Sequence, residues 1–220
     1  MTTAASSSAR APARPGWGLA LRIAAVLTLA SIALFAANGV SEESVRAWIR
    51  ATARASIALF LMAFVARPLH QLWRGGVSSW LLANRRYLGA SAAYAQLLHG
   101  LALVWLFRAW PEKAEANLVT LVGGGLGFAL YFAMGLSSND AAVAALGKRA
   151  WKALHTLGVY WIWVIFAVTN WGNVELALAG KLGPAHQVLY VGIQVALLGA
   201  LALRIVARLR GRRAEEFSRA

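Results

Sequence analysis

The chain contains no cysteine among its 220 residues. Disulfide bonds, iron–sulfur clusters and a thiolate-ligated haem are therefore excluded, because each of them needs cysteine sulfur. Charged residues are also scarce, at 14% of the chain, whereas soluble domains hold about 25%. Only 8 residues are acidic, and none of these lies inside the apolar segments defined below. A transporter or pump coupled to protons usually carries such buried acids, so this class is disfavoured.

Several catalytic motifs are missing as well. No GxGxxG sequence follows a strand-like run, and no segment between the apolar runs is long enough to fold a flavin or nicotinamide site. The chain also lacks a Ser–His–Asp set, a pair of carboxylates and an HExxH motif. A hydrolase and a self-contained flavin or nicotinamide enzyme are therefore not expected.

Apolar residues make up 60% of the chain and gather into long runs. A helix needs about 20 residues to cross a hydrocarbon core of roughly 30 Å, and six segments meet this length. The sequence therefore predicts an all-α fold, an integral membrane bundle of six transmembrane helices. The predicted spans are Trp17–Ala37, Ala47–Arg67, Tyr87–Phe107, Leu118–Leu136, Trp151–Trp171 and Gln187–Ala207.

The basic residues predict the orientation of this bundle. With the N-terminus inside, 16 of the 22 Lys and Arg residues fall on the inner side, as the positive-inside rule requires. Both termini are therefore expected in the cytoplasm of a multi-pass protein of the bacterial inner membrane. The net charge of +14 could also suggest nucleic acid, but the basic residues bracket apolar runs and do not form a stripe on a soluble face. The lipid bilayer is the expected partner, and nucleic acid is not.

Three regions are expected along the chain. Residues 1–16 form a disordered basic leader, residues 17–207 form the six-helix domain, and residues 208–220 form a basic cytoplasmic tail. Pro68 is expected to end the second span, with residues 67–86 as a longer amphipathic inner loop. Asn139 or Asp140 is expected to cap a short helix before the fifth span.

Two of the four histidines lie within predicted spans. His99 is near the middle of the third span, and His155 lies about one turn inside the fifth. Both spans run from inside to outside, and two imidazoles suit a low-spin b-type haem, which needs no cysteine. His99 is about 10 Å deeper than His155 by helix rise, so one haem between them would need tilted helices. Alternatively, each histidine only hydrogen-bonds a carbonyl or hydroxyl of a neighbouring helix.

The other two histidines lie near the membrane surfaces. His70, at the inner end of the second span, is a candidate inner-side ligand or an interfacial residue. His186 opens the sixth span on the outer side and is expected to face water or headgroups. Polar-tipped residues such as Gln96 and Tyr131 lie inside spans, where they line a cofactor or quinone pocket or simply pack between helices. Gly123 and Gly127 permit close helix packing, a dimer face or space for a macrocycle.

Two stretches resemble a known family. NRRYLGASAAYAQLLH ends in His99, and SSNDAAVAALGKRAWKALHTLGVYWIWVIF contains His155. The RRxLG that precedes a histidine and the LGKRxW…LHxxxxY pattern resemble the ferric reductase-like transmembrane domain family. Within it the chain is similar to the haem-binding membrane subunits of bacterial methionine sulfoxide reductase systems. Family members commonly carry a further histidine about thirteen residues past the position of His155, where this chain has apolar or amide residues.

The resemblance implies a membrane electron-transfer subunit with one b-type haem, ligated by His99 and His155. Electrons would pass from a quinol or cytoplasmic-side donor to a periplasmic-side acceptor, with a periplasmic reductase as the expected partner and a quinone as a second cofactor. A catalytic residue is not expected, because the flavin and nicotinamide domains of full ferric reductases are missing. The alternatives are a haem-free scaffold or assembly protein of the same fold and a small-solute transporter, the latter weakened by the lack of buried acids.

Overall fold

A computed structural model describes the backbone of residues 16–113 and 118–217, so the predicted leader lies almost wholly outside the described residues. The described chain is helical, with one 3-10 turn and no strand. The elements are α1 (Trp17–Asn38), α2 (Glu42–Leu72), α3 (Gly76–Ala109), η1 (Pro111–Lys113), α4 (Leu118–Leu136), α5 (Asp140–Leu178) and α6 (Pro184–Phe217). The predicted all-α membrane bundle is therefore confirmed.

Five of these helices are long and apolar enough to cross a membrane: α1, α2, α3, α5 and α6. The described apolar part of α4, Leu121–Leu136, is shorter, so a sixth span remains a prediction. Large apolar side chains face outward, as on α1, where Leu21 is 69% exposed. Such a surface suits lipid, and the chain is a multi-pass membrane protein by this criterion.

The helix ends follow local signals in the sequence. Ser41 caps α2 by accepting a hydrogen bond from the Ser44 amide at 3.2 Å, and the acidic Glu42 and Glu43 occupy the positive first turn. The predicted cap before the fifth span is confirmed as Asn139, whose side chain accepts from the Ala142 amide at 2.7 Å. Gly147 has a φ of +75°, a conformation that favours glycine, and it kinks α5 between its capped first segment and the long span.

Two expectations about the loop between the second and third spans are wrong. Pro68 does not end its helix, because α2 continues to Leu72, and the loop reduces to residues 73–75 before α3 begins at Gly76. Proline removes one helical hydrogen bond, but Pro68 is buried together with Ala66. The helix stays continuous around this buried proline, as is common in membrane helices.

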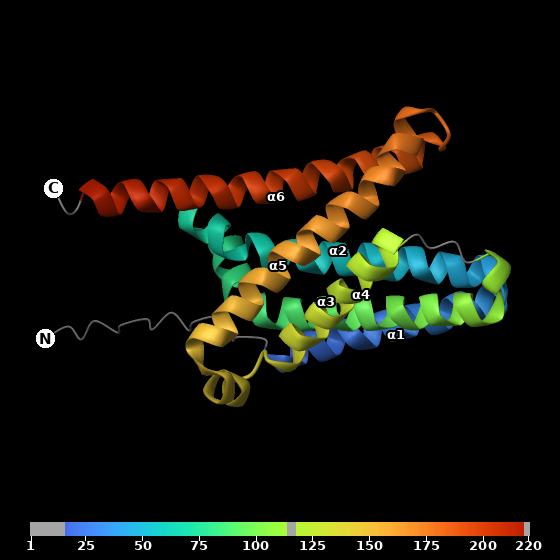
Figure 1. The fold of residues 1–220 in the computed structure, drawn as a ribbon, viewed down its shortest axis with the longest axis horizontal. Coiled ribbons are helices and arrows are strands. Elements are labelled where there is room, and N and C mark those ends of the chain that lie inside the picture. The colour runs from blue at the N-terminus through green and yellow to red at the C-terminus, as the bar shows by residue number, and fades with distance from the viewer. Residues whose placement is uncertain (1–15, 114–117, 218–220) are drawn as a thin grey trace, which may run out of the picture.

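Successive helices run in opposite directions, and the start of α1 lies toward the same end of the bundle as the end of α6 (Figure 1). The pair α2 and α3 forms the centre, packed through small residues such as Ser56, Ala92 and Ala95, all at most 1% exposed. The helix α5 crosses the bundle obliquely and packs against α4 and α6. Two cavities lie within the bundle, and residues of α2, α3, α4, α5 and α6 line them.

Candidate functional site

The larger cavity has a volume of about 1140 Å³ and is lined by five helices. His99 is the one histidine among its described lining residues, and we call it the His99 cavity. The His99 ring is half-buried on α3 and lies parallel to the Phe128 ring of α4, with the centroids 6.1 Å apart. Ligand pockets usually measure about 300–1,000 Å³, so this cavity has the size of a large cofactor.

The orientation of His99 is set by a backbone oxygen. Its Nδ1 lies 3.1 Å from the carbonyl oxygen of Ile49 on α2. A carbonyl can only accept, so Nδ1 carries the proton and donates, which leaves a lone pair on Nε2. Metal-bound histidines commonly use this arrangement, in which one ring nitrogen donates to a carbonyl and the other binds the metal. His99 therefore has the orientation and tautomer that a metal ligand bonding through Nε2 would need.

Gln96 lies one helical turn before His99 and also lines the cavity. It is 8% exposed, and its side-chain oxygen has no hydrogen-bond partner within the part of the chain that the structure describes. A buried acceptor left unpaired costs about 1–3 kcal/mol. An occupant of the cavity that supplies a donor or a bridging water would remove this cost.

Basic residues line the His99 cavity along α2. Arg46, Arg50 and Arg54 follow one another at intervals of four residues and therefore share one helix face. Arg54 donates to the Tyr190 hydroxyl at 3.2 Å, and Arg46 donates to the Lys113 carbonyl at 2.7 Å. Guanidinium groups bind carboxylates well, and a haem carries two. Their four-residue spacing in the sequence is the signal for this shared face.

The fourth helix forms a glycine-rich wall of the same cavity. Gly124, Gly125 and Gly127 line it, and a Cβ added at Gly124 or Gly125 would meet no atom within 4 Å. Gly123 instead packs against α5, because a Cβ there would lie 3.0 Å from Ile165 Cδ1. Gly123 thus serves packing within one bundle, whereas Gly124 and Gly125 leave open space along the cavity wall.

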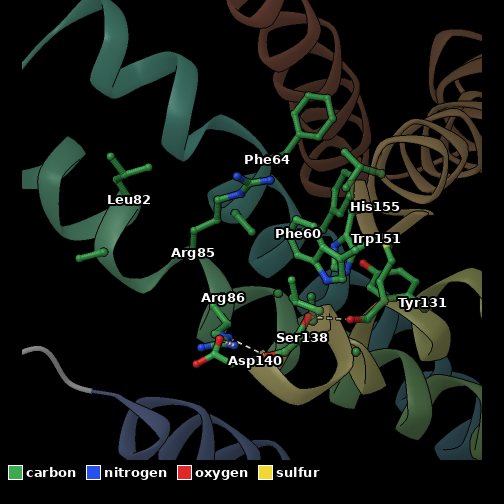
Figure 2. Close-up of a pocket in the computed structure, with 18 of the residues that line it drawn as sticks. Phe60, Phe64, Leu82, Arg85, Arg86, Tyr131, Ser138, Asp140, Trp151 and His155 are labelled. Carbon is green, nitrogen blue, oxygen red and sulfur yellow. Dashed lines mark hydrogen bonds and ion pairs between the residues drawn. The ribbon is translucent and has the colours of Figure 1, made fainter. Parts of the chain in front are cut away.

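The smaller cavity, of about 520 Å³, contains His155 and lies toward the bundle end where α2 ends and α3 begins. We call it the His155 cavity. Figure 2 shows Arg85, Phe60, Trp151 and His155 around it. The His155 ring lies against the Trp151 indole, with the centroids 4.2 Å apart, and its Nε2 lies 3.1 Å from the Ser137 hydroxyl.

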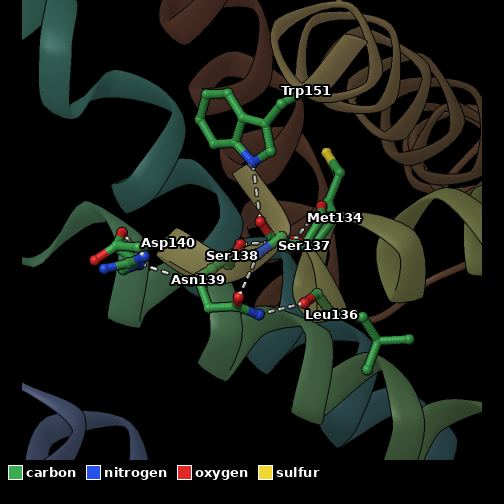
Figure 3. A network of polar contacts seen from close by, with 9 residues as sticks. Met134, Leu136, Ser137, Ser138, Asn139, Asp140 and Trp151 are labelled. Atoms are coloured by element: carbon green, nitrogen blue, oxygen red, sulfur yellow. Dashed lines mark hydrogen bonds and ion pairs between the residues drawn. The ribbon is translucent and has the colours of Figure 1, made fainter. Parts of the chain in front are cut away.

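A polar network holds the wall beside His155 (Figure 3). The Trp151 indole donates to the Ser137 carbonyl at 2.9 Å. Arg86 donates to the Ser138 carbonyl at 2.6 Å and to the Asp140 carboxylate at 2.7 Å. These bonds tie α3, the turn after α4 and the start of α5 together. Ser137 is a site residue that sequence reasoning missed, since a lone serine carries no spacing signal.

The structure does not bring His99 and His155 into one cavity. Tyr131 is the one described residue that lines both cavities. Its ring contacts Phe166, with centroids 6.2 Å apart, and Phe60, at 6.4 Å, and its hydroxyl accepts a hydrogen bond from Ser56 at 3.3 Å. We call Phe60, Tyr131 and Phe166 the aromatic partition. These rings from α2, α4 and α5 separate the two histidine sites.

The remaining two histidines lie outside both cavities. His70 Nδ1 is 3.2 Å from the Ser78 hydroxyl, which also bonds the Trp73 and Gly75 carbonyls in the α2–α3 turn. His186 is exposed at the start of α6, near the Tyr190 ring. In the described residues no group of three or more His, Cys, Asp or Glu side chains could hold a metal ion. Any iron would therefore depend on a macrocycle for most of its ligands.

Three curated proteins are similar to this chain, and each is named protein-methionine-sulfoxide reductase heme-binding subunit MsrQ. The protein from Azospira oryzae is 31% identical over 159 residues, which cover 69% of this chain and 61% of the relative. The protein from Brucella anthropi is 24% identical over 205 residues, covering 90% of this chain and 88% of the relative. The protein from Ralstonia nicotianae is 29% identical over 156 residues, covering 68% and 67%.

The chain spans 61% of the length of the Azospira protein, and no protein-family model matches it. No solved structure matches it either. The three names agree with one another and with the helical architecture, so the predicted resemblance is confirmed: the chain is a distant relative of the haem-binding subunits of the methionine sulfoxide reductase system.

Proposed function

We propose that this chain is a haem-binding electron-transfer subunit of the membrane, with His99 and His155 as iron ligands. The observation that carries the proposal is the His99 cavity. It combines a cofactor-sized volume with an imidazole whose Nδ1 is bonded to Ile49. The names of the three relatives agree with this reading.

The residues present fit a haem of the b type. The chain has no cysteine for covalent attachment, and His99 Nε2 is available as an axial ligand. The Arg50 and Arg54 guanidiniums would hold carboxylates, and the glycines of α4 would admit the flat ring. When bound, haem supplies a one-electron carrier. The protein residues position that carrier, hold its carboxylates and keep lipid away from it.

The arrangement of the two cavities supports transfer across the membrane. They follow one another along the bundle, divided by the aromatic partition. We propose that His155 is the ligand of a second site in its own cavity, and that one haem is not shared between the two histidines. His70 receives no ligand role here, because it lines neither cavity.

The direction of transfer rests on the charge pattern. With the basic ends of the bundle in the cytoplasm of a bacterial inner membrane, the His155 cavity would face the donor side. A quinol or a cytoplasmic reductant would supply electrons there, and a periplasmic reductase would take them at the side of the His99 cavity. Quinone binding is part of this proposal.

Purification in detergent from cells supplied with a haem precursor tests the function. The wild-type protein should show a Soret band and the reduced α-band of a b-type haem. His99→Ala should lose the haem of the His99 cavity, because the ligand is gone, while the matched control His186→Ala should keep it, since His186 lines neither cavity. A colourless but folded wild-type protein would refute the proposal and leave a haem-free scaffold.

A further inference from the structure

The side chains of the His99 cavity that could bind iron lead to a further inference, which rests on the proposed function. All four histidines of the chain lie among the described residues, and of these His99 alone lines this cavity. Sulfur ligands are also lacking, because the chain has no cysteine and neither Met62 nor Met134 is among the lining residues. A second strong axial ligand is therefore missing from the described walls.

Several of the polar groups that line the cavity are committed to other bonds. On α5, the Thr169 hydroxyl donates to the Ile165 carbonyl at 2.7 Å, and the Asn170 amide donates to Gln194 at 2.9 Å. The Tyr190 hydroxyl accepts from Arg54, and the Lys113 ammonium is paired with Glu42 at 2.6 Å. None of these groups offers iron a nitrogen with a lone pair.

Much of the α5 wall of the cavity is apolar. Ile165, Phe166 and Val168 line it, together with the small residue Gly172. The main packing partners of α5 are α4 and α6, so α5 and α3 contribute different walls. A side chain at position 168 would reach the cavity from a helix other than the one that carries His99.

We propose that iron in the His99 cavity has one axial ligand from the protein, His99 Nε2, and that its other axial position is open to a small exogenous ligand. Such a haem is high-spin and binds carbon monoxide when reduced. A haem held between two imidazoles is low-spin and resists carbon monoxide, because both positions are taken. The inference therefore has a spectroscopic signature that is independent of activity.

The test uses carbon monoxide and the full-length protein in detergent. His155→Ala removes the ligand of the other cavity, so that the remaining signal reports on His99. In this variant we expect a high-spin ferric signal by electron paramagnetic resonance and a carbon monoxide difference spectrum after reduction. Haem that is present but low-spin, with no response to carbon monoxide, would overturn the inference and leave the proposed function intact. If neither this variant nor the wild type contained haem, both the inference and the proposed function would be refuted.

A designed second ligand sharpens the test. Adding Val168→His to the His155→Ala variant should turn the signal low-spin and abolish the carbon monoxide response, because the new imidazole occupies the open position. Val164→His is the matched control on the same helix, since Val164 does not line the cavity, and it should leave the high-spin signal unchanged. An identical spectrum in the Val168→His and Val164→His proteins, with haem bound in both, would contradict the placement of the open position.

Discussion

His99 and Ile49 meet across the most extensive helix contact of the bundle, between α3 and α2, where the imidazole Nδ1 donates to the Ile49 carbonyl at 3.1 Å. This bond connects α3 with α2 and fixes the ring tautomer at the same time. Ile49 lies on the face of α2 that also carries Arg50 and Arg54 toward the cavity. One backbone oxygen thus prepares the ligand beside the groups that would hold the carboxylates of a haem.

Filling the His99 cavity should displace a haem without unfolding the bundle. Gly124→Leu places a large side chain in space that a Cβ enters without meeting any atom within 4 Å. We expect the haem of the His99 cavity to be lost and total haem to fall by about half, with the haem of the His155 cavity retained, as measured by the pyridine haemochrome. Gly199→Leu is the control, because Gly199 is exposed on α6 and lines neither cavity. Full haem content in Gly124→Leu would place the haem elsewhere.

Ser137 should tune the His155 site. Its hydroxyl lies 3.1 Å from His155 Nε2 and also bonds the Met134 carbonyl at 3.3 Å. In a His99→Ala background, Ser137→Ala should shift the Soret band or lower the haem content, because the ring loses its polar partner. Ser138→Ala is the matched control, since the Ser138 hydroxyl bonds Met134 and not His155. Equal spectra for the two serine variants would argue that this contact does not affect the site.

A buried amide pair should stabilise the contact of α5 with α6. Asn170 is 5% exposed, and its side chain donates to the Gln194 side chain at 2.9 Å and to the Tyr190 carbonyl at 3.0 Å. Hydrogen bonds between membrane helices contribute about 0.6–1.7 kcal/mol, so Asn170→Leu should destabilise the protein by about that amount. Thermal unfolding in detergent measures it. Asn173→Leu, at a partly exposed position where the side chain bonds the Thr169 carbonyl of its own helix, should change the midpoint much less. Equal shifts in the two variants would show that the Asn170–Gln194 pair adds no particular stability.

The ion pairs at the start of α2 predict a pH dependence. A hydrogen bond from Lys113 is the main cause that holds the pKa of the Glu42 carboxyl below its usual value, and a hydrogen bond from Arg46 is the second. In return, Glu42 raises the pKa of Lys113. The stabilisation is therefore present above the ordinary pKa of 4.5 for Glu42 and is lost as the pH falls through the lowered value. It is also lost as the pH rises through the raised pKa of Lys113.

The measurement compares unfolding midpoints of the wild-type and Glu42→Gln proteins across pH. The wild type should be slightly more stable at neutral pH, and the difference should vanish in acid below the lowered pKa of Glu42. The effect should be small, because both side chains are partly exposed. A difference that persists unchanged into acid would show that Glu42 acts through something other than its charge.

Much of the fold could be predicted, because the length of an apolar run and the residue that caps a helix are both local signals in the sequence. The predicted start at Trp17 and the Asn139 cap are both present in the structure. The loop around Pro68 was not predictable in this way, since proline is a helix breaker by local rules, whereas in the fold it is buried inside a continuous helix. Residues after 207, expected as a tail, continue α6 to Phe217.

The site was predictable only in part. A histidine inside an apolar span is a visible signal, so His99 and His155 could be chosen from the sequence. Their separation depends on the oblique crossing of α5 and on the rings of Phe60, Tyr131 and Phe166, which lie far apart in the sequence and meet only in the fold. Helix rise indicated a difference in depth, but it carries no information about the partition between two cavities.

The haem content of three proteins tests the central claim that each histidine serves its own site. Wild type, His99→Ala and His155→Ala should be purified side by side, and their haem-to-protein ratios measured together with their spectra. We predict that each variant keeps part of the haem and that the two residual spectra differ and add up to that of the wild type. Complete loss of haem in both variants, with the fold intact and the wild type coloured, would mean that the two histidines share one haem and would contradict the account.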